Sequence, residues 1–178
     1  MATVLSYRPN RVTFPQQVYC DANFLISIYE PNHQWHQKAS ALLIELTNKK
    51  IEIHVSVLAV DEALCQLLIL SYEDKKGKGS WHQHKPLKRN PNIIKQFCPE
   101  LDRFVRNLWK LPNLRLIDGS TQTFNLIDDA LRNIAQYSLA PRDAFHLAIL
   151  NAIGLSMILT NDHDFERVKA PISVLHFW

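Results

Sequence analysis

The sequence has few of the residues that stabilise secreted or membrane proteins. It contains only three cysteines in 178 residues, Cys20, Cys65 and Cys98, far apart in apolar segments and with no Cys-x-x-Cys pair. This argues against a disulfide framework or a zinc site. No apolar run approaches the roughly 20 residues that cross a bilayer, and residues 1–10 lack a signal-peptide core. We therefore expect a cytoplasmic protein with no membrane association.

The chain also has little net charge, only +3, but the charge is unevenly distributed. Residues 75–95 contain seven basic side chains and no Asp or Glu. The rest of the chain is therefore mildly acidic, and the basic segment is a candidate surface for an anionic partner.

Short apolar segments alternate with helical patterns along the chain. Strands are expected at 18–20, 51–55, 114–117, 156–160 and 172–175, with helices between them. With 47% hydrophobic residues, the length suits one domain with a full core. The pattern predicts an α/β fold, a three-layer α/β/α sandwich around a mostly parallel five-stranded sheet. We expect residues 1–16 to be an irregular extension and residues 17–178 to form a single domain, with a basic loop inserted at about 74–91.

Two of the expected helices have clear capping residues. Ser56 precedes a helix at 57–72 that is apolar nearly all round and is therefore expected to be buried. Ser120 precedes a helix that runs to about residue 137, and another helix begins at Pro141.

Acidic residues recur where strands end and helices begin. Asp21 follows the first strand, Asp162 and Asp164 follow the fourth, and Glu62 and Asp143 lie in the first turns of their helices. The carboxyl ends of parallel strands share one edge of the sheet, and right-handed crossovers start helices at that edge. These carboxylates can therefore converge on one cleft, where their repulsion favours a divalent cation such as Mg²⁺ or Mn²⁺.

Most of these acids also have a purely structural interpretation. Asp21, Asp162 and Asp164 could cap helices, and Asp143 could simply complement a helix dipole. Glu62 has no such explanation. For His146, three residues after Asp143, a hydrogen-bonded structural role is preferred to a role as ligand or general base.

Four segments, taken in order, resemble the successive motifs of the PIN domain. They are Val-Tyr-Cys-Asp21-Ala-Asn23, the stretch from Ser56 to Glu62, Pro-Arg-Asp143-Ala-Phe-His146-Leu-Ala, and Leu-Thr160-Asn-Asp162-His-Asp164-Phe165. The resemblance implies a metal-dependent ribonuclease, often the VapC-type toxin of a toxin–antitoxin pair.

The resemblance also implies roles for individual residues. Asp21, Glu62, Asp143 and Asp162 correspond to the acidic quartet that holds metal, and Asp164 could share or take the place of Asp162. The groups that would orient the quartet are Asn23, Ser56 and Thr160. Bound Mg²⁺ or Mn²⁺ would activate a water for in-line attack on a phosphodiester.

The basic segment is a candidate RNA-binding surface. Lys85, Lys88 and Arg89 lie near the ring residues Trp81, His82, His84 and Phe97, and positive charge combined with stacking surfaces holds single strands. An ordinary solvated loop is the alternative. Arg142 is a second candidate phosphate contact. Trp35 and Trp178 are candidates for a homodimer face or an antitoxin groove, with core packing preferred for Trp35.

Two rival functions remain open on the sequence. One is a phosphohydrolase of the haloacid dehalogenase type with Asp21 as nucleophile, but this chemistry needs a second Asp where the chain has Asn23. The other is a non-catalytic PIN-like module that binds RNA or protein. The complete acidic quartet argues against that module, because the repulsion within the quartet would serve no purpose there.

Overall fold

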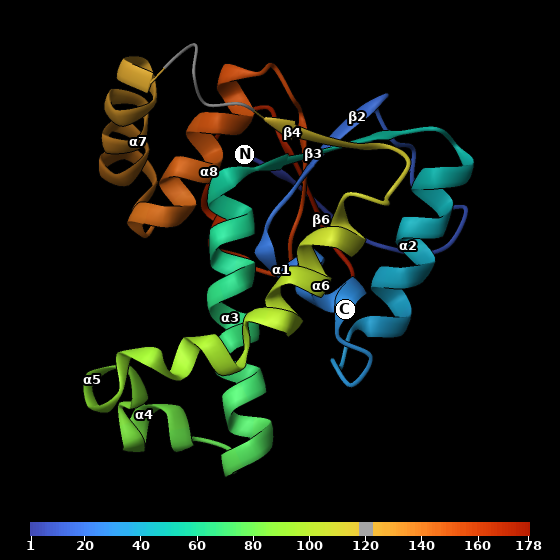
Figure 1. Cartoon of the computed structure of the whole chain (residues 1–178). Coiled ribbons are helices and arrows are strands. Elements are labelled where there is room, and N and C mark those ends of the chain that lie inside the picture. Colours follow the sequence, from blue (N-terminus) through green and yellow to red (C-terminus); the bar gives the residue numbers. More distant parts are fainter. Residues whose placement is uncertain (118–122) are drawn as a thin grey trace.

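A parallel six-stranded sheet organises the computed structural model, which describes residues 1–117 and 123–178 (Figure 1). The strand order is β1-β6-β5-β2-β3-β4, and every neighbouring pair is parallel. The α/β architecture is confirmed, but the expected count of five strands was one too few. The strands are β1 (Thr3–Ser6), β2 (Gln17–Cys20), β3 (Glu52–Ser56), β4 (Leu114–Ile117), β5 (Met157–Leu159) and β6 (Ser173–His176).

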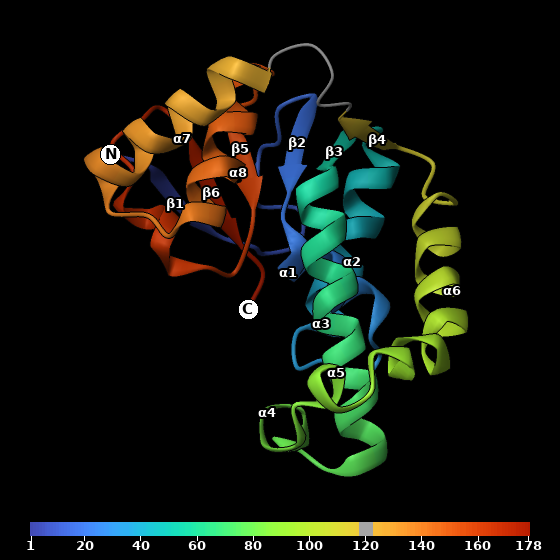
Figure 2. The ribbon, with the colours of Figure 1, turned by 60° about the vertical axis from the view of Figure 1, so that its left-hand side comes forward.

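Helices cover both faces of the sheet (Figure 2). One face carries α1 (Ala22–Tyr29), α2 (His36–Asn48), α3 (Val57–Lys76) and α6 (Cys98–Leu108), and the other carries α7 (Thr123–Tyr137) and α8 (Pro141–Ala152). Alternation along β2 divides its side chains between two cores, because Val18 and Cys20 face α1 to α3 whereas Tyr19 faces α8. The cap predicted at Ser120 lies outside the described residues.

The first sixteen residues are less irregular than expected. Residues Thr3–Ser6 form β1, which pairs with β6 in the register Thr3 to Ser173. Tyr7 is buried, and its hydroxyl donates to Oε2 of Glu45 at 3.0 Å. This amino-terminal segment therefore contributes an edge strand and a buried side chain to the fold.

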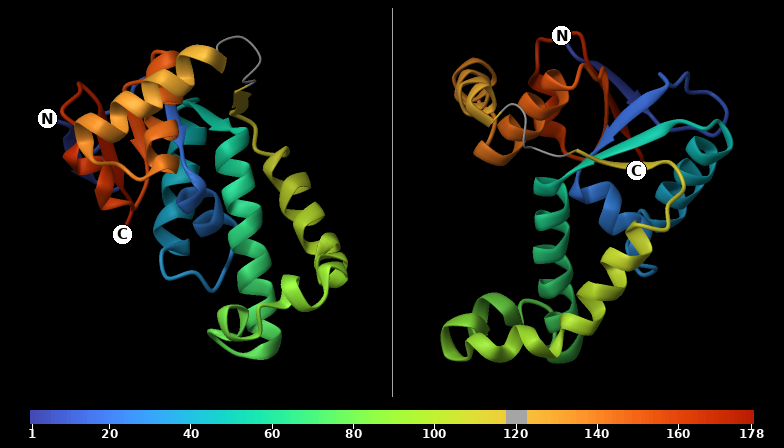
Figure 3. Two further views of the ribbon diagram at one scale, coloured as in Figure 1. Left: turned by 90° about the vertical axis from the view of Figure 1, so that its left-hand side faces the viewer. Right: turned by 45° about the horizontal axis from the view of Figure 1, so that its top comes forward.

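The expected basic loop is largely helical. Helix α3 continues to Lys76, and α4 (Ser80–His84), α5 (Pro86–Arg89) and the 3₁₀-helix η1 (Pro91–Gln96) follow before α6. Gly77 and Gly79, with φ of 94° and 80°, flank the turn between α3 and α4. We call residues 73–97 the distal arm, which projects away from the sheet (Figure 3).

All three cysteines are free, with Cys20 buried and Cys65 and Cys98 exposed. Within residues 1–117 and 123–178, no helix is sufficiently long and apolar to cross a membrane.

Candidate active site

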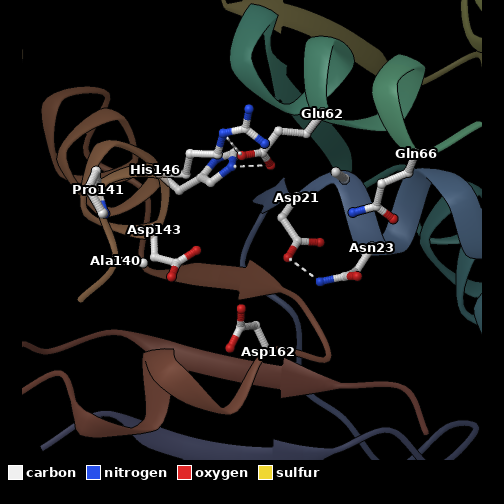
Figure 4. A pocket seen from close by; sticks show the side chains of 11 residues that line it. Asp21, Asn23, Glu62, Gln66, Ala140, Pro141, Asp143, His146 and Asp162 are labelled. Carbon is white, nitrogen blue, oxygen red and sulfur yellow. Dashed lines mark hydrogen bonds and ion pairs between the residues drawn. The ribbon is translucent and has the colours of Figure 1, made fainter. Parts of the chain in front are cut away.

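A cleft lies at the carboxyl ends of β2 and β5, between α3 and α8 (Figure 4). Its volume is about 510 Å³. Four carboxylates reach it from four separate elements: Asp21 after β2, Glu62 on α3, Asp143 on α8 and Asp162 after β5. The remaining lining residues are Ala22, Asn23, Gln66, Ala140, Pro141, Arg142 and His146.

Asp21 is buried and uses both of its carboxylate oxygens. Oδ1 caps α1 by accepting from the backbone N–H of Phe24 at 3.2 Å. Oδ2 accepts from the Thr160 hydroxyl at 2.5 Å and from the Asn23 amide at 3.3 Å. Burial raises the pKa of Asp21, and these hydrogen bonds oppose the shift. Asp21 therefore caps a helix and also belongs to the cleft.

Thr160 connects Asp21 to Asp162. Its hydroxyl oxygen accepts from the backbone N–H of Asp162 at 2.9 Å while donating to Asp21. Asp162 in turn caps the 3₁₀-helix η3 (His163–Arg167) by accepting from the N–H of Asp164 at 2.8 Å. Asp164 is paired with Arg167 at 2.6 Å and is not among the lining residues. The structure thus brings Asp162, and not Asp164, into the cleft.

A buried chain of hydrogen bonds runs from β2 to Glu62. The Tyr19 hydroxyl lies 2.7 Å from Ser56 Oγ and 2.5 Å from His146 Nδ1. His146, only 2% exposed, places Nε2 3.0 Å from Glu62 Oε2, and Arg142 Nε lies 3.5 Å from Glu62 Oε1. Ser56 also caps α3, as expected. Ser56 therefore reaches the acidic group only through Tyr19 and His146.

Three lining or supporting residues were missed or undervalued from the sequence. Tyr19 could have been found from strand alternation, which turns it away from Val18 and Cys20. Gln66 lies four residues after Glu62, so it lies on the same face of α3. His146 is hydrogen-bonded as expected, but its partners place it inside the cleft.

Negative charge accumulates around Asp143. Its pKa is raised to about 6, first by burial and then by the charge of Asp162, with smaller contributions from Asp164 and Glu62, while His146 acts in the opposite direction. A divalent cation would relieve this repulsion, so the donor set fits Mg²⁺ or Mn²⁺.

The cleft carboxylates do not form a closed ligand cage. No three of them bring oxygens within 4.8 Å of one another. Mg²⁺ usually binds one or two carboxylates directly and keeps several waters, so a closed cage is not required for binding.

The two groups of predicted RNA-binding residues lie apart. Arg142 borders the cleft with its side chain 63% exposed. Lys85, Lys88 and Arg89 are exposed on the distal arm. At 1.5 Å per residue, the stretch of α3 from Glu62 to its end separates cleft and arm by about 20 Å.

Most of the ring residues of the arm are used for packing. Phe97 is buried with Tyr72, and Trp81 packs edge-on against Tyr72 with centroids 5.6 Å apart. His84 Nδ1 lies 3.0 Å from the Tyr72 hydroxyl. The prediction that Phe97 offers a stacking surface was therefore wrong, because its ring is buried. His82 is exposed.

The position of Thr160 gives a direct prediction. We expect Thr160→Val to lower the affinity of the cleft for Mn²⁺ by about 10- to 100-fold, because losing an outer partner of metal-binding groups has this effect on metal affinity or activity. The measurement is a titration of each variant with Mn²⁺. Thr160→Ser keeps the hydroxyl and should retain most of the affinity; equal losses in both variants would contradict the prediction.

Comparisons with known proteins agree with this fold. The family model described as PIN domain matches residues 18–171. No curated protein matches the chain. Among solved structures, the chain is similar to Mycobacterium tuberculosis VapC20, a toxin that cleaves the sarcin–ricin loop, with a TM-score of 0.56 and 12% identity over 87% of this chain and 98% of that one.

Two further structures share the fold. VapBC2 from Rickettsia felis, bound to a DNA fragment from its promoter, gives a TM-score of 0.55 and 18% identity over 91% of this chain and 99% of that one. FitAcB from Neisseria gonorrhoeae gives a TM-score of 0.51 and 16% identity, over 90% of this chain and 98% of that one. Identities this low show a common fold.

Proposed function

This chain belongs to the PIN-domain family, and on that premise we propose that it is a metal-dependent endoribonuclease. The observation that carries the proposal is the convergence of four carboxylates, from four elements, on one cleft. Hydrogen bonds to Asp21 and the contacts of Glu62 with His146 and Arg142 offset part of their repulsion, and a bound cation would offset the rest. The fold is typical of nucleases in which such acids hold divalent metal.

Asp21, Glu62, Asp143 and Asp162 would hold Mg²⁺ or Mn²⁺ in this proposal. A bound ion would supply an activated water and would neutralise charge on the leaving oxygen of the phosphodiester. Asp162 is proposed as the fourth acid because it lines the cleft, whereas Asp164 is paired with Arg167.

The surrounding residues position the acids. Thr160 and Asn23 fix the Oδ2 atom of Asp21 by donating hydrogen bonds to it. His146 holds one oxygen of Glu62 from inside the protein, while Arg142 lies beside the other oxygen at the surface. The exposed Arg142 guanidinium is suited to contact an RNA phosphate.

The proposal is tested with a mixed RNA pool and Mn²⁺. Cleavage should depend on the metal and should be absent with excess EDTA or with Asp143→Asn protein. Cleavage that persists in both samples would refute a metal-dependent nuclease. Intact RNA under every metal condition would instead favour the alternative of a binding module.

The phosphohydrolase alternative is weaker. That chemistry needs an acid two residues after Asp21, but Asn23 occupies the position and donates to the Asp21 carboxylate. An amide cannot serve as a general acid or base in place of a carboxyl group.

We also propose that the protein is the toxin of a toxin–antitoxin pair. Support comes from the solved structures of similar fold, which include the VapC20 toxin and a VapBC2 complex. The tryptophans considered for a partner surface have other contacts, since Trp35 packs against the main core and the Trp178 ring lies 3.7 Å from that of His176. Both rings are only partly exposed, so each offers a limited surface to an antitoxin.

The distal arm is proposed to hold RNA phosphates through Lys85, Lys88 and Arg89. We expect their joint replacement by Ala to lower RNA affinity and to reduce the slope of log K against log salt by about 2, since each phosphate contact on single strands contributes about 0.7. Binding of RNA should be measured over a range of salt concentrations.

A matched control removes three exposed lysines elsewhere, Lys50, Lys110 and Lys169. It changes the net charge by the same amount and should leave the slope nearly unchanged. An equal change in both triple variants would show that only overall charge matters.

A further inference from the structure

Three side chains near the carboxyl terminus form a compact cluster outside the acidic cleft. His163 and Glu166 lie on η3 and His176 lies on β6, and one ligand atom from each falls within 4.8 Å of the other two. Glu166 Oε1 is 2.6 Å from His163 Nδ1 and 3.0 Å from His176 Nε2. We propose that these three residues form a second metal site, suited to Zn²⁺.

The orientation of His176 supports this proposal. The ring is fully buried, and Nδ1 lies 2.7 Å from the backbone oxygen of Thr160. A carbonyl oxygen only accepts, so Nδ1 carries the hydrogen and the Nε2 lone pair of the neutral ring faces the Glu166 carboxylate. A bare Nε2 lone pair beside a carboxylate needs a positive centre between the two atoms, which is either a proton, as in a His–Glu ion pair, or a metal ion. A histidine that donates its other N–H to a carbonyl is also the usual arrangement of a metal ligand.

The donor set differs from that of the cleft. Two imidazole nitrogens and one carboxylate oxygen are a set that binds Zn²⁺ with a water in the fourth position, whereas carboxylates alone suit Mg²⁺ or Mn²⁺. His163 is 71% exposed and Glu166 is 35% exposed, so an ion and its water can enter from solvent. The cysteine count argued against a zinc site, but these ligands contain no cysteine.

The site would join η3 to β6 and so secure the segment that carries Asp162. Asp162 caps η3, and its backbone N–H donates to the Thr160 hydroxyl. The carbonyl of the same Thr160 accepts from His176. The Trp178 ring packs against His176, with the ring centroids 3.7 Å apart. The metal would therefore cross-link η3 and β6 close to the acidic cleft.

Zinc binding is best measured on full-length Asp21→Asn/Asp143→Asn protein, in which the cleft has lost two acids. Titration against a chromophoric chelator should show one Zn²⁺ per chain, and Co²⁺ should give the absorption spectrum of a tetrahedral site. Adding His163→Ala should weaken binding by more than about 100-fold, beyond the usual loss for an outer partner. Unchanged affinity, or no zinc uptake by the parent protein, would overturn the proposal.

Further variants separate ligand loss from misfolding. Zn²⁺ should raise the thermal unfolding midpoint of the parent but not of the His163→Ala protein, because only a site that binds the ion is stabilised by it. Glu166→Gln keeps the size of the side chain and should give the same loss, and the exposed His82→Ala should change nothing. Equal zinc responses in all four proteins would overturn the proposal, and none of these measurements depends on ribonuclease activity.

Discussion

Asp143→Asn protein is expected to lose RNA cleavage by about 100- to 1,000-fold or more while remaining folded. The amide keeps the shape of the side chain but removes the negative charge with which the cleft would hold a metal ion. Loss of one preorganised charge-stabilising group alone has an effect of this size. The measurement is the single-turnover cleavage rate in saturating Mn²⁺, with circular dichroism as a check on the fold.

Asp164→Asn provides the matched control for this experiment. It removes a carboxylate from the same region, but one that is paired with Arg167 and lies outside the cleft lining. We expect its rate to stay within about threefold of the wild type, since exposed ion pairs contribute little. A loss as large as that of Asp143→Asn would instead assign Asp164 to the metal-binding group.

Acid should weaken metal binding sharply. Because the pKa of Asp143 is about 6, a metal ion must displace a proton from this carboxyl group below that pH. The apparent Mn²⁺ affinity should therefore be nearly constant above pH 7 and fall about tenfold per pH unit below pH 6. The pH dependence of the Mn²⁺ affinity is obtained by comparing cleavage rates at subsaturating and saturating Mn²⁺ from pH 5 to 8. A flat profile would contradict it.

The raised pKa of Asp143 also affects the stability of the metal-free protein. Metal affinity increases as pH rises, but the contribution of Asp143 to stability decreases. The native state holds the Asp143 proton up to about pH 6, whereas the unfolded chain releases it near 3.8. Between these values the native state binds more protons, so this group contributes less stability as pH rises. In EDTA, Asp143→Asn should gain free energy of unfolding relative to the wild type between pH 4 and pH 7, as measured by urea denaturation.

Much of the fold was predictable because its determinants are local. Strand alternation, the apolar helical faces and the caps at Asp21 and Ser56 are each encoded within a few residues. The parallel order of the central strands then follows from alternating strands and helices. The same rules placed Asp21, Glu62, Asp143 and Asp162 at one edge of the sheet, where the structure has them.

The features that were missed depend on contacts between distant residues. The four-residue β1 has no pattern of its own and exists because β6 pairs with it. In the distal arm, Gly77 and Pro86 are residue types common in loops, but here they lie at a helix end and a helix start. The chain from Tyr19 to His146 likewise joins residues 127 positions apart.

Helix α3 has a further consequence for the RNA products. It contains no glycine or proline between Val57 and Lys76, so it is a continuous rod that carries Glu62 near one end and leads into the distal arm at the other. If the arm holds RNA, α3 fixes the distance between the RNA-binding residues of the arm and the acidic cleft. We then expect cleavage at a constant number of nucleotides from the RNA segment that the arm binds. Lengthening or shortening the rod by whole turns would reset that number without altering the chemistry.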